Sequence, residues 1–449
     1  MPADSTAKPS SNQVSKWKKA TVIALRICKW AFAFGLVCGF FGAGLAFGYI
    51  GALVHDDPVR PKEEMIEKIN ENVITGFVYF NDDSLVGQLR TEEDRRLASV
   101  NEIPQVVKDA VLSIEDADFY KHHGIDIKGL FRALTERFTN AEVQTGASTI
   151  TQQLARRVFL TLERTDKRKA KEIFLALRME RFLSKEQILL AYLNKIHFGN
   201  GSSGYNLYGI KAAAKGIFNI DDLSQLNVAQ AAYLAGLPQQ PAVFSAYTSK
   251  GEFNEEGFKR AMDRQKLVLK RMYEEGKLTE SQYQEALQFD IRATLAQPQQ
   301  KAYATYPYLM LEVERQAADI LARLNNPDLN PDTKDYAEAL KEARAQLLSK
   351  GYHIYTTIDK TIYDEMRAIA ENDANFMPDD KTKGMEHVAA VMLDNKTGAI
   401  LGMIEGRDFH KEQMNLATQM YRQPGSTMKT IGAYIPAIEK GAIAPATVI

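Results

Sequence analysis

The sequence predicts a mainly α-helical protein with one membrane-spanning helix near its N-terminus and a smaller α/β domain at its C-terminus. A long uncharged apolar segment at residues 30–54 predicts the membrane helix. Apolar residues at helical spacing dominate residues 66–290. Alternating apolar residues and a hairpin-like turn, both after about residue 350, predict the α/β domain.

The composition excludes several classes of protein. The 449 residues carry 56 basic and 57 acidic side chains, a formal net charge of −1, which argues against a nucleic-acid protein held by a global positive field. There are two cysteines, Cys28 and Cys38, and both lie in or beside the apolar segment. We therefore expect no disulfide framework and no cysteine-ligated metal site.

Residues 30–54 are 25 residues without a charge, enough as a helix to cross a hydrocarbon core of about 30 Å. A basic cytoplasmic tail at residues 1–29 precedes them, and acids are frequent in residues 56–64 that follow. This asymmetry predicts a cytoplasmic N-terminus, with the rest of the chain outside the cell membrane. A cleaved signal peptide is the alternative, but its apolar core is usually only about 7–15 residues long. The sequence therefore favours an uncleaved, single-pass anchor.

The region after the anchor divides into three parts. Residues 66–290 are predicted to be mainly helical, with a capping-box signature at Ser184. Residues 291–348 form a linker region that is polar at first and then helical in periodicity. Residues 349–449 show strand-like alternation, and two of the alternating stretches flank residues 395–398, as in a β-hairpin.

Two runs of polar residues accompany the predicted helices. The first, residues 115–124, places Glu115 and further acids directly after an apolar helical face. The second places Ser148, Gln152 and Arg156 four residues apart, a hydroxyl, an amide and a guanidinium that suit phosphate oxygens near a helix N-terminus. Taken alone, the second run is more simply explained as an amphipathic helix with a solvated face.

A third run is strongly basic. Five cations lie within residues 164–171, and a lone carboxylate, Glu172, follows them. Such a cluster is usually a solvated face or a contact for lipid headgroups. Here it also surrounds an acid with permanent positive charge.

A fourth run, residues 188–204, ends in glycines spaced as Gly-x-Gly-x-x-Gly. A dinucleotide-binding fold requires a strand before this string, whereas a helix is predicted before it here. We therefore interpret the glycines as a flexible lip over an elongated groove.

In order and spacing, the four runs together resemble the motifs of the family 51 peptidoglycan glycosyltransferases, the polymerase half of class A penicillin-binding proteins. The resemblance rests on Glu-Asp-x-x-Phe-x-x-His-x-Gly at 115–124, Gly-x-Ser-Thr-Ile-Thr-Gln-Gln at 146–153, Arg-Lys-x-x-Glu at 168–172 and Tyr-Leu-Asn-x-Ile-x-Phe-Gly-x-Gly from 192. It covers about residues 66–290 and implies a lysozyme-like, mainly α glycosyltransferase domain.

The resemblance also implies roles for individual residues. Glu115 is implied as the general base and Glu172 as the second acidic residue of the site. Three cations are implied to hold the donor pyrophosphate and three polar side chains to line the site: Arg156, Arg164 and Lys171, and Ser148, Gln152 and Gln153. Departures from the family pattern, such as Ala147 for glycine and His197 for tyrosine, leave these residues in place.

The implied reaction joins a lipid-pyrophosphate-linked sugar, lipid II, to a growing glycan strand. A positioned carboxylate can take the proton of the acceptor 4-hydroxyl. The leaving pyrophosphate needs charge stabilisation rather than protonation, which arginine, lysine or a divalent cation (magnesium or manganese) at the donor pyrophosphate can supply. No organic cofactor is implied. Attack from the face opposite the leaving group inverts the anomeric carbon.

Two other functions stay open beside the polymerase. A lytic, lysozyme-like hydrolase must protonate a sugar alkoxide, and a carboxylate surrounded by cations is poorly suited to hold that proton. A non-catalytic membrane scaffold needs none of the four runs. The expected partners are therefore lipid II, the growing glycan strand, membrane lipids and other cell-wall synthesis proteins, and not nucleic acid.

A Ser-x-x-Lys string at Ser426 and Lys429 indicates a second chemistry. The Pro-Gly pair before it places the serine at a helix start with the lysine one turn on, close enough to take its proton. With the hairpin, the string resembles the penicillin-binding transpeptidase domain, which implies Ser426 as the acylated nucleophile and Lys429 as its base. Only 23 residues follow Ser426, without the Ser-x-Asn and Lys-Thr-Gly elements of that family. We therefore expect an incomplete transpeptidase domain, in a fragment or an interrupted gene product, that does not cross-link peptides.

Overall fold

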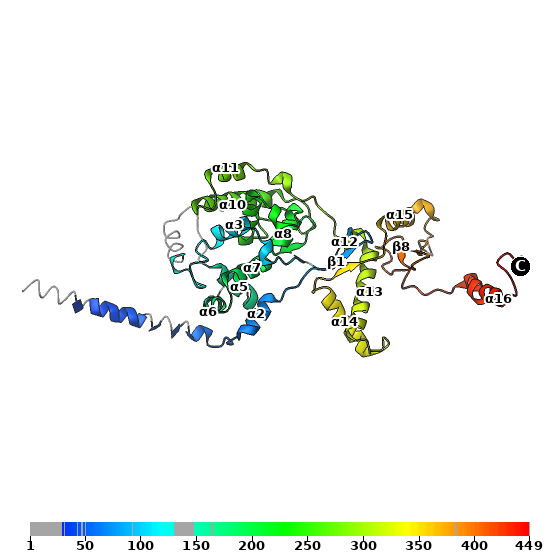
Figure 1. Cartoon of the computed structure of the whole chain (residues 1–449), viewed down its shortest axis with the longest axis horizontal. Coiled ribbons are helices and arrows are strands. Elements are labelled where there is room, and N and C mark those ends of the chain that lie inside the picture. Colours follow the sequence, from blue (N-terminus) through cyan, green and yellow to red (C-terminus); the bar gives the residue numbers. More distant parts are fainter. Residues whose placement is uncertain are drawn as a thin grey trace, which may run out of the picture. The chain divides into compact units, whose positions relative to one another are not determined.

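The computed structural model describes residues 29–30, 32–42, 44–45, 48–49, 51–91, 93–129, 148–161, 163, 165–380, 382 and 384–448. The chain forms two compact units, coloured along the sequence in Figure 1. The first unit takes its residues from Met1–Glu71 and Val111–Lys195, and the second from Asn72–Ala110 and Ile196–Ile449.

The first unit is helical. Its elements are α2 (Lys62–Asn70), the end of α3 (Gln105–Glu115), α5 (Ile150–Phe159), α6 (Asp166–Phe182) and α7 (Lys185–Lys195). Helix α5 packs against both α6 and α7, because its apolar face, with Ile150 and Leu154, is fully buried. The capping box predicted at Ser184 is confirmed, since Ser184 Oγ accepts from Gln187 N and Gln187 Oε1 accepts from Ser184 N.

The predicted membrane anchor is only partly described. Its described residues within 29–54 are helical, and large apolar side chains such as Trp30 and Phe40 are exposed. Over the described residues, no helix combines the length and the apolar character that crossing a bilayer requires. The single-pass anchor at residues 30–54 therefore stays a prediction.

The second unit contains the remaining predicted helices of residues 66–290. They are α8 (Ile210–Phe218), α9 (Val228–Gly236), α10 (Glu255–Glu274) and α11 (Glu280–Gln288). Helix α9 is buried along nearly its whole length against α10. A small sheet has the strand order β3-β5-β4, from Glu93–Arg95, Asn206–Tyr208 and His197–Asn200. Short 3-10 turns lie at Val100–Glu102, Leu223–Gln225, Leu237–Gln239, Arg292–Thr294 and Asp373–Asn375.

Of the glycines interpreted as a flexible lip, Gly199 lies in β4, and Gly201 and Gly204 lie in a packed turn between β4 and β5. Gly201 N donates to Tyr205 O at 2.9 Å, and Ser202 N donates to Gly216 O at 2.9 Å. Gly204 has φ +75°, and a Cβ built on it would lie 2.3 Å from Ser249 O. Glycine is needed there because the backbone of a neighbouring segment approaches closely.

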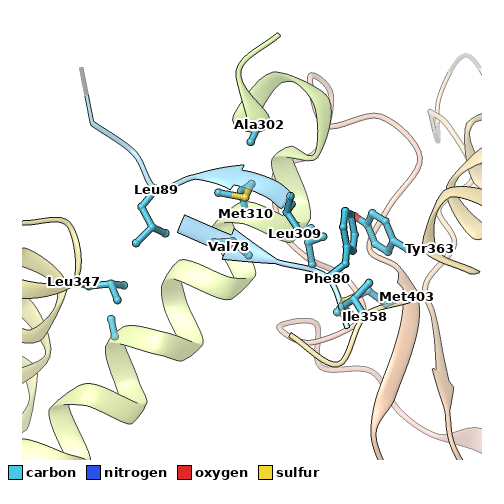
Figure 2. Close-up of a cluster of buried hydrophobic side chains, with 12 residues drawn as sticks. Val78, Phe80, Leu89, Ala302, Leu309, Met310, Leu347, Ile358, Tyr363 and Met403 are labelled. Atoms are coloured by element: carbon cyan, nitrogen blue, oxygen red, sulfur yellow. The ribbon is translucent and has the colours of Figure 1, made fainter. Parts of the chain in front are cut away.

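A second sheet joins segments from opposite ends of the sequence. Strand β1 (Phe77–Tyr79) pairs antiparallel with β2 (Leu85–Gln88) and parallel with β6 (His353–Tyr355). These strands share a core with α12 (Ala302–Thr305), α13 (Pro307–Asn325) and α14 (Lys334–Leu347). Figure 2 shows Val78 of β1 and Phe80, which follows that strand, together with Leu309 and Met310 of α13. Much of the predicted linker at residues 291–348 is thus packed structure, and the predicted domain boundaries themselves stay predictions.

The predicted hairpin is confirmed. Strands β7 (Ala390–Leu393) and β8 (Ile400–Ile404) pair antiparallel, and Asp394 Oδ1 caps the turn by accepting from Lys396 N at 3.1 Å. Helix α15 (Lys360–Glu371) packs against β8. After the hairpin come the helical turns Gly425–Thr427, Thr430–Tyr434 and α16 (Ile435–Glu439).

Candidate active site

Glu115 ends α3, and the turn after it is tied to the start of α5. Asp116 Oδ2 accepts a hydrogen bond from Ile150 N at 2.9 Å, and Asp116 Oδ1 lies 2.9 Å from His122 Nε2. Gly124 N donates to His122 Nδ1 at 3.1 Å, so the ring proton belongs on Nε2, which donates to Asp116. This buried network fixes the end of α3 against α5 and so directs the Glu115 side chain.

The Glu115 carboxylate is half-buried and held from one side. Gln153 Nε2, on α5, donates to Glu115 Oε2 at 2.7 Å. The hydroxyl of Tyr192, on α7, donates in turn to Gln153 Oε1 at 3.4 Å. Within the described part of the chain nothing bonds Glu115 Oε1. That oxygen is therefore available to take a proton from a substrate hydroxyl.

Glu115 and Arg156 both influence the pKa of Tyr192. Burial raises the pKa of Tyr192 well above its ordinary value, and the negative charge of Glu115 raises it further. The positive charges of Arg157 and Arg156 lower it. Glu115 and Arg156 therefore both act on the Tyr192 hydroxyl. Their catalytic roles stay predictions.

Glu172 belongs to a second cluster, on α6. Its side chain has 0% exposure, and Arg168 and Lys169, one turn earlier on the same helix, both form ion pairs with it. Two cations compensate the cost of burying this charge. The carboxylate is sealed from solvent and holds these two cations, and its predicted catalytic role stays a prediction.

Lys169 connects the two clusters. Its Nζ donates to Ser148 Oγ at 2.8 Å and to Gln152 Oε1 at 3.3 Å, at the N-terminus of α5. The N-cap of α5 is Thr149, whose side chain accepts from Gln152 N, while Gln152 Oε1 accepts from Thr149 N. Ser148 thus precedes the helix and Gln152 is buried in a capping box. This corrects the predicted solvent-facing stripe through Ser148, Gln152 and Arg156.

Lys171, another predicted pyrophosphate ligand, is placed beside a hollow. Lys171 Nζ lies 3.0 Å from Asp57 Oδ1, and both residues line a hollow of about 450 Å³ together with Arg60 and Arg178. Burial opposes ionisation of Asp57, but hydrogen bonds from Lys171 and Arg60 outweigh it and lower the pKa of Asp57. Arg164 lies outside the described residues.

Ser426 lies in the first turn of the helical run after the hairpin, as the sequence predicted. Its side chain and that of Lys429 are exposed. Within residues 384–448, which the structure describes, no hydrogen bond joins Ser426 to Lys429. The predicted acylation pair is therefore present in position but not in contact.

Two family profiles match the chain. The profile described as Transglycosylase matches residues 82–273, and the one described as Penicillin binding protein transpeptidase domain matches residues 388–449. Penicillin-binding protein 1A/1B of Bacillus subtilis is 31% identical over 439 residues, 97% of this chain and 43% of that protein. Penicillin-binding protein 1A of Clostridium perfringens is 29% identical over 449 residues, 97% of this chain and 62% of that protein.

The chain belongs to the class A penicillin-binding proteins. It spans about half the length of the relatives that it matches, including penicillin-binding protein 1F of Bacillus subtilis, which is 32% identical over 79% of this chain and 44% of that protein. In this class A penicillin-binding protein, Glu115, Gln153 and Glu172 all lie within the segment that matches the transglycosylase profile.

The sequence interpretation of this class A penicillin-binding protein missed Lys169, although a signal for it was present. Lys169 and Glu172 are three residues apart on a predicted helix, a spacing at which side chains of opposite charge pair. Likewise, Thr149 and Gln152 match the capping box, which predicts that the Gln152 side chain bonds the backbone at the helix N-terminus.

Proposed function

We propose that this class A penicillin-binding protein is a peptidoglycan glycosyltransferase that polymerises lipid II into glycan strands with inversion at the anomeric carbon. The observation that carries the proposal is the half-buried Glu115 carboxylate, held through Oε2 by Gln153 with Oε1 left for substrate. The match of residues 82–273 to the transglycosylase profile supports the same reaction.

In the proposed reaction, Glu115 Oε1 takes the proton of the acceptor 4-hydroxyl while that oxygen attacks C1 of the donor sugar. The bond from C1 to the pyrophosphate oxygen breaks, and the pyrophosphate leaves as an anion. Arg156 stabilises the departing charge, together with Arg164 and Lys171 as predicted from the family. A pre-arranged donor of this kind typically contributes about 3 kcal/mol to the transition state.

Lys169 extends this cationic set. Its side chain is 37% exposed, although it also pairs with Glu172 and donates to Ser148 and Gln152. A lysine held by three partners loses little conformational freedom when a phosphate oxygen approaches it. We therefore assign Glu172 the task of positioning Lys169 and Arg168.

A divalent cation at the pyrophosphate is a separate expectation. Among the described residues, no group of three or more histidine, cysteine, aspartate or glutamate side chains is arranged to hold a metal ion. Magnesium usually binds through one or two carboxylates plus substrate phosphates. No step of the proposed mechanism runs through such an ion.

We also infer that the protein works at the outer face of the cell membrane, anchored by residues 30–54. The hollow beside Lys171 supports this location, because it is lined by Arg60, Arg178 and Arg181 and by apolar side chains. Two of those apolar side chains, Phe174 and Leu177, are exposed. Cations beside exposed apolar groups suit a lipid surface. The proposed partners are lipid II, the growing strand, membrane lipids and other cell-wall synthesis proteins.

The direct test is to incubate the purified 449-residue chain with lipid II in detergent and to separate the products by length. Glycan strands of many disaccharides, joined with inverted configuration at C1, are expected. Shortening of added glycan strands would instead identify a lytic hydrolase. If the glycan strands became neither longer nor shorter, the scaffold function would remain and the proposal would be overturned.

A further inference from the structure

A hollow of about 770 Å³ in the second unit lies outside the cluster around Glu115 and Glu172. Its volume is in the range of small-molecule sites. Two cations, Arg90 and Lys301, line it beside three aromatic residues, Tyr205, Tyr303 and Phe409. No carboxylate belongs to its described lining. The hollow is therefore positively charged and partly apolar.

The two cations are held by aromatic faces. Lys301 Nζ lies 4.6 Å from the centre of the Tyr205 ring, and the guanidinium of Arg90 lies 5.0 Å from the centre of the Tyr303 ring. Contacts of this kind orient a cation without neutralising it. Arg90 also lies 3.8 Å from the buried Glu314, a long contact. For Lys301, no described carboxylate lies within ion-pair distance.

Hydrogen bonds hold the wall around Tyr303. The Tyr303 hydroxyl donates to Glu314 Oε2 at 2.8 Å and accepts from Arg90 N at 3.2 Å. Glu314 is in turn paired with Arg344 of α14. These contacts hold Tyr303, and its ring lies against the Arg90 guanidinium.

We propose that this hollow binds the acidic peptide that hangs from each disaccharide of the glycan strand. A peptide ends in at least one carboxylate, which Arg90 and Lys301 can pair with, while its small apolar side chains pack on Pro307, Leu311 and Phe409. The polar side chains of Asn206 and Gln413 can bond its amide groups. The identity of the ligand rests on the proposed function; the preference for an anion rests on the hollow alone.

The test is calorimetric titration of the full chain in detergent with a disaccharide pentapeptide that has free carboxylates. Saturable binding is expected, and Lys301→Gln or Arg90→Gln should weaken it about tenfold each. Amidating the ligand's carboxylates should weaken it by a similar factor. Lys259→Gln, an exposed lysine of α10 outside the hollow, should leave the affinity unchanged. Lys301→Arg should restore binding, which guards against a folding defect in Lys301→Gln.

Three results would overturn this inference. They are the absence of saturable binding, equal affinity of wild type and Lys301→Gln, and equal affinity for the disaccharide without its peptide. Binding by Glu115→Gln separates this inference from the proposed function. That variant should lose polymerisation and keep the affinity, so failure of polymerisation and failure of peptide binding appear in different measurements.

Discussion

The regions around Glu115 and Ser426 both carry predicted reactive groups, but they are built differently. Glu115 is bonded by Gln153, and the residue after it, Asp116, is buried and bonded to two separate segments. Around Ser426, every residue from 418 to 435 is exposed. The first region is a pre-arranged site, whereas the second has the local motif without surrounding groups that fix it. A sequence motif forms a reactive site only where other elements pack around it and fix its side chains.

The largest effect is expected where burial is most complete, at Glu172. Glu172→Gln removes a carboxylate with 0% exposure and leaves Arg168 and Lys169 facing a neutral group. We expect a loss of about 3 kcal/mol in the free energy of unfolding of the first unit. Hydrogen exchange of α5 and α6 measures it. Glu274→Gln, which removes partly exposed pairs on α10, is the control and should change stability by less than about 0.5 kcal/mol. Equal effects of the two variants would show that the Glu172 cluster is not pre-arranged.

Glu405, a buried acid in the second unit, should make the stability of that unit depend on pH. Burial raises its pKa from 4.5 to about 7, against the opposing hydrogen bond from Tyr363. The folded state thus binds a proton more tightly than the unfolded state. This stabilisation is complete below about pH 4.5 and is lost as the pH rises through about 7.

Protection of β8 and α15 from hydrogen exchange should therefore decrease between pH 5 and pH 8, by on the order of 2–3 kcal/mol. Glu405→Gln keeps an oxygen for the Tyr363 hydroxyl and should flatten this dependence. A profile that keeps its slope in Glu405→Gln would assign the pH effect to another group.

Variants of Lys169 and Lys167, two lysines of α6, form a matched pair. Lys169→Met removes the bonds to Ser148 and Gln152, so the first turn of α5 and with it Gln153 and Glu115 lose a support. We expect the turnover rate of polymerisation to fall about 10- to 100-fold with little change in KM. Lys167→Met removes only an exposed contact with Asp56 and should leave both constants unchanged. If both variants were equally active, Lys169 would not position the site.

The smallest effect is expected at Ser426. Without a hydrogen bond to Lys429, its hydroxyl lacks an activating base, so the 449-residue chain should not be labelled by a fluorescent penicillin. A transpeptidase that is labelled under the same conditions serves as the control. Label that appears in the wild type and disappears in Ser426→Ala would show that the exposed region is a working site after all.

Local features of the fold could be predicted from the sequence, and distant pairings could not. The β7–β8 hairpin and the capping box at Ser184 were predicted because their partners are a few residues apart. The pairing of β1 with β6 was not, since 277 residues separate Tyr79 from Thr356, whose hydroxyl donates to Tyr79 O at 2.9 Å. Nothing in the periodicity of a three-residue strand selects such a partner.

In the candidate site, too, local features could be predicted from the sequence and contacts between distant segments could not. Glu115 could be chosen from its motif, but the hydrogen bond from Gln153 depends on how α5 packs against the end of α3. Ser148 and Gln152 were predicted from the family resemblance to line the site, but their bonds at the start of α5, which begins at Ile150, could not be predicted.

The most direct test of the account is the rate of lipid II polymerisation by Glu115→Gln beside Ser426→Ala. The amide can still accept the Gln153 hydrogen bond, so the fold is kept while the base is removed. We predict that Glu115→Gln lowers the rate by about 10²- to 10⁴-fold and that Ser426→Ala polymerises as the wild type does. Polymerisation by Glu115→Gln at the wild-type rate would contradict the account.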